Sequence, residues 1–377
     1  MIRFAGKLAL QQRVLPNYRA PFFDLLAAAC DGGMSLFSGL PRPAEGITVA
    51  KELKVANYKL GNNIHLFSGN FYLCYQQELI DWLKEWKPDA LIVEANPRYL
   101  STSSAVKWMH QQRRPVIGWG LGSPPLSAPH FLRKWGGSEG GVGFRKQRRL
   151  SFINQFDAML SYSQRGADQY ASLGFPKEKI FVAHNSVAMP PSSRMPSRPS
   201  TLELRPNILF VGRLQARKRI DYLLRACAEL KQNIRLVIIG DGPERNTLQS
   251  LAKEIYPSAA FVGPKHGTEL KSYFAEADLF ILPGTGGLAV QEAMSYGLPV
   301  IVAQGDGTQD DLVRKANGWQ IPPDDYDALV STMKNALSDV ARLRRMGEES
   351  YRIVKEEINI EKMVETFVTA LNSLTGK

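Results

Sequence analysis

The chain has 377 residues, 44% of them hydrophobic, with 47 Lys and Arg against 36 Asp and Glu, a formal net charge of +11. This length accommodates two domains of ordinary size, and the apolar content excludes a disordered protein. The three cysteines, Cys30, Cys74 and Cys227, are far apart in the sequence, which excludes a disulfide framework and indicates buried thiols in a reducing compartment.

The first half of the chain alternates short apolar runs with helical patterns. Such runs predict strands around Leu8–Leu10, at 91–93, at 115–118 and at 159–160. Helical patterns predict helices from Pro21, from Ser103 and over roughly 151–156. Because strands and helices alternate, we expect a mostly parallel sheet.

Residues 189–206 are rich in Pro, Ser and Arg and show no periodicity, which is typical of a linker. The alternation then resumes. We expect strands from Asn207, at 236–239, at 260–262 and at 279–282, and helices from Asp221, Glu244, Thr268 and Leu288. A last helix over 360–374 carries one apolar stripe.

Two cations follow the strand that begins at Asn207. In the segment from Gly212 to Lys218, Arg213 and Lys218 lie at the carboxyl end of that strand, near the start of the next helix. Cations beside a helix N-terminus predict an anion site, in which Arg grips phosphate bidentately and Lys acts as a point charge.

A second glycine-rich element runs from Gly284 to Met294 and favours a diphosphate as the anion. Glu292 lies one helical turn after Leu288 and can accept hydrogen bonds from both hydroxyls of a ribose. A surface salt-bridge pair is the alternative for Arg213 and Lys218, and a solvated helix carboxylate is the alternative for Glu292; the motif around each favours function.

The two elements together resemble the donor site of the retaining glycosyltransferases of family four, which have the GT-B fold. The resemblance continues through the segments 173–176, 185–187, 239–243 and 297–301, while the first half of the chain matches loosely. It implies an α/β protein with two doubly wound Rossmann-like domains facing a central cleft. On this basis we expect an acceptor-side domain over 1–188, a linker over 189–206, a nucleotide-sugar domain over 207–355, and a C-terminal helix over 356–377 that packs back on the first domain.

The resemblance also implies roles for single residues. Arg213 and Lys218 would stabilise the diphosphate leaving group, and Glu292 would hold the ribose. The donor would further contact residues of the surrounding loops, namely Gly212, Gly263, Lys265, His266, Thr285, Gly286, Gly287 and Leu288.

One position departs from the family pattern. The family carries a first Glu eight positions before the ribose-binding Glu, and this chain has Gly284 there. The missing Glu commonly contacts the transferred sugar, so the identity of the sugar and the consequence of this glycine stay open. Glycine still allows a ligand to approach the main chain closely.

The first domain offers polar residues at its predicted strand ends. The family often places a His there, and the segment Gly118–Gly122 has none, so His130 is considered as its stand-in. Residues that could contact a sugar or an acceptor are Tyr18, Arg19, Glu94, Asn96, Trp119, Gly120, His130 and Asn185.

No metal or cofactor is expected. The Asp325-Tyr326-Asp327 triplet opens a late helix, where capping is the better interpretation. Two cations can supply the charge that a metal would bring. No paired carboxylates suggest a nucleophile, so the resemblance implies front-face attack.

A basic cluster interleaved with aromatic residues suggests contact with an anionic membrane; its members are Arg133, Lys134, Arg145, Lys146, Arg148 and Arg149. A solvated helix face is the alternative, and no nucleic acid is expected because no binding module accompanies the charge. Without a predicted leader or membrane span, we expect a cytoplasmic protein, peripheral on the inner face of the plasma membrane.

The function predicted from these features is retaining transfer of a sugar from a UDP- or GDP-linked donor to a glycan or lipid-linked acceptor. A GT-B nucleotide-sugar 2-epimerase is one alternative. A degenerate transferase that acts as a glycan-binding or partner subunit is another.

Overall fold

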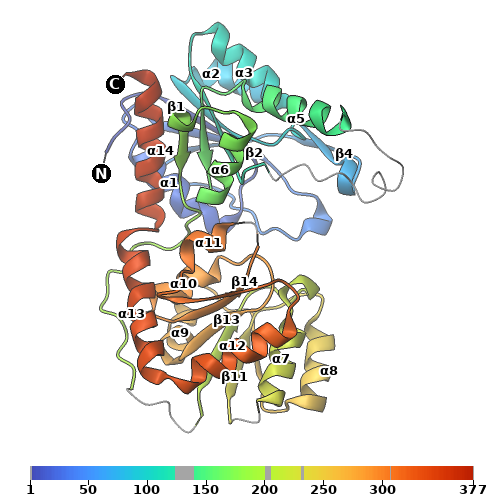
Figure 1. The fold of residues 1–377 in the computed structure, drawn as a ribbon. Helices are drawn as coiled ribbons and strands as arrows, with labels where there is room; N and C mark the ends of the chain where they lie inside the picture. The colour runs from blue at the N-terminus through green and yellow to red at the C-terminus, as the bar shows by residue number, and fades with distance from the viewer. Residues whose placement is uncertain (1, 124–139, 200–204, 231–232, 306, 377) are drawn as a thin grey trace. The chain divides into compact units, whose positions relative to one another are not determined.

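The computed structural model describes residues 2–123, 140–199, 205–230, 233–305 and 307–376 (Figure 1). The chain divides into two compact units, one of Met1–Asn185 with Glu361–Lys377 and one of Ser186–Ile360. Each unit contains its own parallel sheet, as the alternation of strands and helices predicts.

The sheet of the first unit has seven strands in the order β3-β2-β1-β6-β7-β8-β9, all paired in parallel. Its strands β1, β6 and β8 are buried except at Arg13 and Glu94, because helices cover both faces of such a sheet. The bounds are β1 Leu8–Val14, β2 Met34–Gly39, β3 Asn57–Leu60, β6 Ala90–Glu94, β7 Val116–Gly120, β8 Ala158–Ser161 and β9 Ile180–Val182.

The α-helices of this unit are α1 Ala20–Ala28, α2 Leu79–Trp86, α3 Ser101–Gln111, α5 Gly140–Ile153, α6 Gln164–Leu173 and α14 Ile360–Thr375. The helix expected over 151–156 is wrong in both bounds, since α5 begins at Gly140 and ends at Ile153. Glycines and a run of charges in its first turns hide the apolar periodicity of α5. The last helix, α14, packs on α1 and β7, with the Phe367 ring 5.1 Å from Phe22 and 4.9 Å from Trp119.

A separate antiparallel hairpin joins β4 Asn63–Leu66 to β5 Leu73–Gln76. Its strands are short and half polar, so neither apolar runs nor a two-residue turn signal announces them in the sequence. The inner side of β5 is buried, with Cys74 fully inaccessible. Main-chain hydrogen bonds tie Cys74 to the segment after β6, from Cys74 N to Arg98 O and from Leu100 N to Cys74 O, both 2.9 Å.

The second unit contains a six-stranded parallel sheet in the order β12-β11-β10-β13-β14-β15. The strands are β10 Asn207–Val211, β11 Arg235–Ile239, β12 Ala260–Gly263, β13 Leu279–Leu282, β14 Val300–Ala303 and β15 Gly318–Ile321. Figure 1 shows α7, α8 and α12 on one face and α9, α10 and α13 on the other. These helices are α7 Ile220–Glu229, α8 Arg245–Ile255, α9 Lys271–Glu276, α10 Ala289–Ser295, α12 Tyr326–Ser338 and α13 Val340–Glu356, with a short α11 Thr308–Leu312.

Most strands of this unit begin within a few residues of the predicted positions. The helix expected from Thr268 differs, because Thr268 lies in a 3-10 turn, Gly267–Leu270, and α9 begins only at Lys271. Gly267 has φ +54, so the chain turns sharply there before a helix can start.

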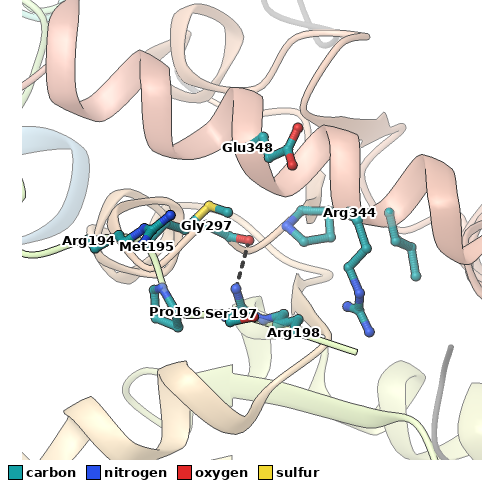
Figure 2. Close-up of a pocket in the computed structure, with 10 residues that line it drawn as sticks. Arg194, Met195, Pro196, Ser197, Arg198, Gly297, Arg344 and Glu348 are labelled. Carbon is teal, nitrogen blue, oxygen red and sulfur yellow. Dashed lines mark hydrogen bonds between the residues drawn. The ribbon is translucent and has the colours of Figure 1, made fainter. Parts of the chain in front are cut away.

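The segment expected as a linker is docked on the second unit. Arg198 donates to four main-chain oxygens, Nε to Ala277 O at 2.8 Å, Nη1 to Tyr296 O at 2.9 Å and Gly297 O at 3.2 Å, and Nη2 to Phe274 O at 3.0 Å. Figure 2 shows the bond to Gly297 in a pocket lined by residues 194–198 and by α13. Burial, reinforced by the neighbouring Arg344, lowers the pKa of Arg198 to about 10. The composition of this segment suggests a flexible chain, but the hydrogen bonds of Arg198 attach it to the second unit.

We expect Arg198→Ala to lower the free energy of unfolding by about 3 kcal/mol, because four carbonyl groups lose a charged donor at once. Urea unfolding followed by circular dichroism measures this loss. Arg194→Ala is the matched control, since Arg194 is an exposed cation of the same segment. Equal stability of the two variants would contradict the anchoring role.

Within the described residues no helix is both long and apolar enough to cross a bilayer. The three cysteines are buried free thiols, as predicted.

Candidate functional site

In the second unit, main-chain hydrogen bonds join the carboxyl ends of β10, β11 and β12 and the loops that follow them. Gly212 N donates to Ile239 O at 3.0 Å, and Gly240 N donates to Gly263 O at 2.9 Å. A Cβ on Gly240 would lie 1.9 Å from Gly212 O, so no side chain can separate these loops. The structure therefore brings the predicted residues Gly212 and Gly263 to one edge of the sheet, with Gly212 partly exposed and Gly263 buried.

Lys218 ends the 3-10 turn η5, Ala216–Lys218, and is 5% exposed. Leu214, also buried, anchors the start of this loop in the core. The Lys218 ammonium donates to Thr285 O at 2.8 Å and to Gly286 O. A buried cation is costly unless polar groups replace its water, and here the carbonyls of the second glycine-rich element do so. The two sequence motifs thus meet at one ammonium group.

Gly284 has no room for a side chain. A Cβ there would lie 2.1 Å from Arg217 O and 2.5 Å from Lys218 Cα. Thr285 N also donates to Arg217 O at 3.1 Å, which holds the two loops together. The departure from the family pattern at this position therefore has a steric cause within the second unit.

Gly286 and Gly287 keep the space beside the Lys218 ammonium open. Their φ angles are +67 and +155, and a Cβ on either would lie 3.8 or 3.7 Å from Lys218 Nζ. A side chain at either position would be strained, and a Cβ on Gly287 would also lie 2.6 Å from Leu282 Cδ2. Leu288 then precedes α10 as its N-cap residue.

Arg213 and Glu292 lie on the elements that flank this loop pair. Arg213 is exposed between β10 and η5. Glu292 is partly buried in the first turn of α10. Burial raises the pKa of Glu292. The pKa of the neighbouring Tyr296 is raised by burial and also by the negative charge of the Glu292 carboxylate.

The loop after β12 carries Lys265 and His266, both predicted to contact the base. Lys265 Nζ forms an ion pair with Glu269 at 2.8 Å, which raises the pKa of Lys265. Glu269 also accepts from His266 N at 3.4 Å. The Lys265 side chain is thus engaged within its own loop, and His266 is exposed at the start of the 3-10 turn.

Three further residues of this region escaped the sequence reasoning. Arg217 donates from Nη1 to Thr285 O at 3.4 Å, and its position beside Lys218 was an available signal. Arg245 lies at the start of α8, its Nη1 and Nη2 each 3.8 Å from the place of a Cβ on Gly263. Nothing in its sequence context singles it out. The third is Gln291.

Gln291, next to Glu292, is 1% exposed and fully engaged. Its Oε1 accepts from Val187 N at 2.7 Å and Ala188 N at 3.0 Å, and its Nε2 donates to Ile358 O at 2.8 Å. Through these bonds α10 is held to the first and last segments of the second unit. Gln291 therefore fixes the helix that carries Glu292.

In the first unit, Arg19 is the centre of an aromatic cluster. It is 7% exposed, and its guanidinium lies 5.7 Å from the Trp119 ring, 5.6 Å from Tyr162 and 5.8 Å from Tyr18. Arg19 Nη2 also donates to Asn185 Oδ1. The structure brings four predicted residues together here, namely Tyr18, Arg19, Trp119 and Asn185, and of these only Tyr18, 52% exposed, is widely open to solvent.

Glu94 ends β6 and accepts from Arg13 N at 2.6 Å. Burial raises the pKa of its carboxyl to about 7, although Arg13 and Arg19 oppose the shift. Nearby, Asn96 accepts from Arg98 N at 3.0 Å. A carboxyl that titrates near neutrality at a strand end is typical of functional sites.

Two residues of the first unit that were predicted to contact a ligand have packing roles. Trp119 is 1% exposed and packs between Phe22 and Phe367, so the core covers its ring. Gly120 is a packing glycine, since a Cβ there would lie 2.5 Å from Tyr170 Oη. His130, Arg133 and Lys134 lie outside the described residues, as do the side chains of Arg145 and Lys146.

The Asp-x-Asp triplet does cap a helix, since Asp325 Oδ1 accepts from Ala328 N at 2.9 Å at the start of α12. In the described parts of the chain, no group of three or more His, Cys, Asp or Glu residues could hold a metal ion.

Comparisons with known proteins show which proteins this chain resembles. Residues 197–353 match the family model described as Glycosyl transferases group 1. The GDP-mannose-dependent alpha-mannosyltransferase of Mycolicibacterium smegmatis is 33% identical over 153 residues, 40% of this chain and 39% of that protein. The chain spans less than half the length of the curated relatives it matches first.

Solved structures agree over nearly the whole chain. The apo lipopolysaccharide outer core galactosyltransferase WaaB superposes with a TM-score of 0.69 at 18% identity, covering 97% of this chain and 99% of that one. Anabaena HepE in complex with UDP gives 0.69 at 14% identity, with coverage of 97% and 99%. These likenesses confirm the predicted GT-B fold of two Rossmann-like domains.

Proposed function

Since residues 197–353 match the family model described as Glycosyl transferases group 1, we propose that the protein is a retaining glycosyltransferase. It transfers a sugar from a nucleotide diphosphate donor, UDP- or GDP-linked, to a glycan or lipid-linked acceptor. The observation that carries this proposal is the buried Lys218 ammonium in the loop Thr285–Gly287, beside two glycines that keep the adjacent space open.

In this mechanism Lys218 and the exposed Arg213 face the donor diphosphate and stabilise the negative charge that grows on it as the glycosidic bond breaks. Only stabilisation that increases in the transition state raises the rate. Glu292 accepts from the ribose hydroxyls. The departing phosphate takes the proton of the acceptor hydroxyl, which attacks from the same face, so that the anomeric configuration is retained and no metal or cofactor takes part.

Both donor nucleotides have support among similar proteins. The mycobacterial relative is named for GDP-mannose, whereas HepE was solved with UDP. Gly284 leaves the sugar subsite without the carboxylate of the family pattern, so the main chain of 285–287 must supply contacts to the sugar.

Titration of UDP and GDP into the protein by calorimetry tests the donor site. We expect one of the two to bind, and products from the matching nucleotide sugars to show retained configuration by NMR. If neither nucleotide binds, the donor assignment fails.

Gly284 also keeps the non-enzymatic alternative open. A degenerate transferase would bind the donor but neither transfer nor hydrolyse it across a panel of acceptors. A 2-epimerase would convert the nucleotide sugar into its epimer, which the same NMR experiment detects.

The pH dependence of donor binding should report on Glu292. Its raised pKa means that it takes up a proton at a higher pH than an ordinary Glu. Because the carboxylate accepts two hydroxyl donors and the acid does not, donor affinity should fall as pH falls through that raised pKa. Folding disfavours the ionised form of Glu292. The free energy of unfolding that this group contributes is therefore lowest at high pH and rises as pH falls through the raised pKa, whereas donor affinity falls. Glu292→Gln should flatten the affinity profile, and an unchanged profile would contradict the ribose contact.

We also propose a peripheral position on an anionic membrane, in the cytoplasm at the inner face of the plasma membrane. Of the basic cluster, Arg148 is described as exposed and Arg149 as partly exposed, both near the end of α5.

A further inference from the structure

The tip of the β4–β5 hairpin exposes two aromatic side chains. Phe67 is 71% exposed and Phe71 is 80% exposed. Phe67 also has φ +58, in the left-handed region that bulky residues rarely adopt. Strain of this kind persists where the surrounding structure enforces it, and here it accompanies an apolar ring presented to solvent.

Side-chain hydrogen bonds fasten the base of the hairpin. Gln76 is 2% exposed, and its Nε2 donates to Gln12 O at 3.1 Å and to Asn63 Oδ1 at 3.0 Å. His65 Nδ1 lies 2.9 Å from Tyr72 Oη. These bonds fix the two strands from which the loop with the exposed rings extends.

A groove of about 740 Å³ lies beside the two rings and combines apolar and basic groups. Phe67, Phe71 and Leu73 line it together with Arg98 and Arg148. Among the residues that the structure describes, no carboxylate lines this groove beside the two guanidinium groups. The patch therefore combines apolar rings with uncompensated positive charge.

We infer that this patch, Phe67 and Phe71 with Arg98 and Arg148, is a docking surface for an anionic lipid bilayer. Aromatic rings gain free energy at the boundary of the acyl region, while guanidinium groups contact lipid phosphates at the depth of the headgroups. Charge complementarity favours an anionic bilayer as the partner, because the chain carries a net charge of +11 and no described carboxylate lines the groove. The inference deepens the proposed transfer to lipid-linked acceptors and rests on it.

Flotation with vesicles of phosphatidylcholine, alone or mixed with phosphatidylglycerol, tests the surface. We expect the protein to float with the anionic vesicles and to stay below with the neutral ones. F67A/F71A and R98Q/R148Q should each lower the bound fraction about tenfold, whereas F67W/F71W should keep it. The matched control is V55A/K54Q, which removes an exposed apolar residue and an exposed cation of the same unit outside the patch.

Each outcome decides the inference. Wild-type protein that does not float, or patch variants that float as well as wild type, would overturn it. So would a dimer in analytical ultracentrifugation that F67A/F71A dissolves, since the patch would then bind a second copy. Calorimetry with UDP and GDP on the same preparations separates the two proposals: intact nucleotide binding without flotation rejects the docking surface alone.

Discussion

Lys218→Ala is expected to weaken binding of the donor nucleotide by about 100-fold, the size of effect that loss of a charged hydrogen bond to a phosphate produces in a buried site. The substitution removes the cation and leaves Thr285 O and Gly286 O without their donor. Calorimetric titration of UDP and GDP measures the affinity. The turnover rate should fall further, since the same charge stabilises the leaving group.

Two controls separate this loss from unfolding. Lys271→Ala removes an exposed lysine of the same unit, at the start of α9, and should leave nucleotide affinity unchanged. Lys218→Arg keeps the charge but enlarges the buried group, and it should recover part of the binding. Unaltered affinity in a folded Lys218→Ala protein would remove the diphosphate assignment.

Gly284→Glu restores the family carboxylate in sequence and should nevertheless abolish donor binding. The new side chain starts 2.1 Å from Arg217 O, so the loop that carries Lys218 must move. We expect a loss of about 3 kcal/mol in the free energy of unfolding, at the upper end of overpacking effects. Urea unfolding and nucleotide titration of the same variant measure both consequences.

Gly212→Ala is the matched control for stability, because its Cβ would meet the nearest atom, on Phe210, at an ordinary 3.4 Å. It should unfold close to wild type. A Gly284→Glu protein that is stable and gains transferase activity would show that the tight loop contact is not a requirement of the site.

The second unit could be predicted well from the sequence because short stretches of sequence determine its strands and its glycine-rich loops. Continuous apolar strands give the sheet, and glycines of the second motif are needed for a left-handed angle, as at Gly286, or for a close main-chain approach, as at Gly284. The meeting of Lys218 with Thr285 follows from strand order, since β10 and β13 are neighbours. Arg245 could not be predicted, because it reaches Gly263 through helix placement alone.

The first unit was less predictable for a physical reason. The β4–β5 hairpin is held by buried polar side chains such as Gln76, which carry no apolar period. Trp119 looked available at a strand end, yet α1 and α14, from opposite ends of the chain, cover its ring. Likewise, burial in the folded unit raises the pKa of Glu94, and Arg13 and Arg19, which oppose the shift, are far from it in sequence.

A crystal structure with the bound nucleotide tests the central claim most directly. The account predicts that a diphosphate oxygen lies within hydrogen-bond distance, about 3 Å, of Lys218 Nζ, with Arg213 on the same diphosphate and the ribose at Glu292. A diphosphate bound elsewhere, with the Lys218 ammonium contacting only the carbonyls of Thr285 and Gly286, would contradict it.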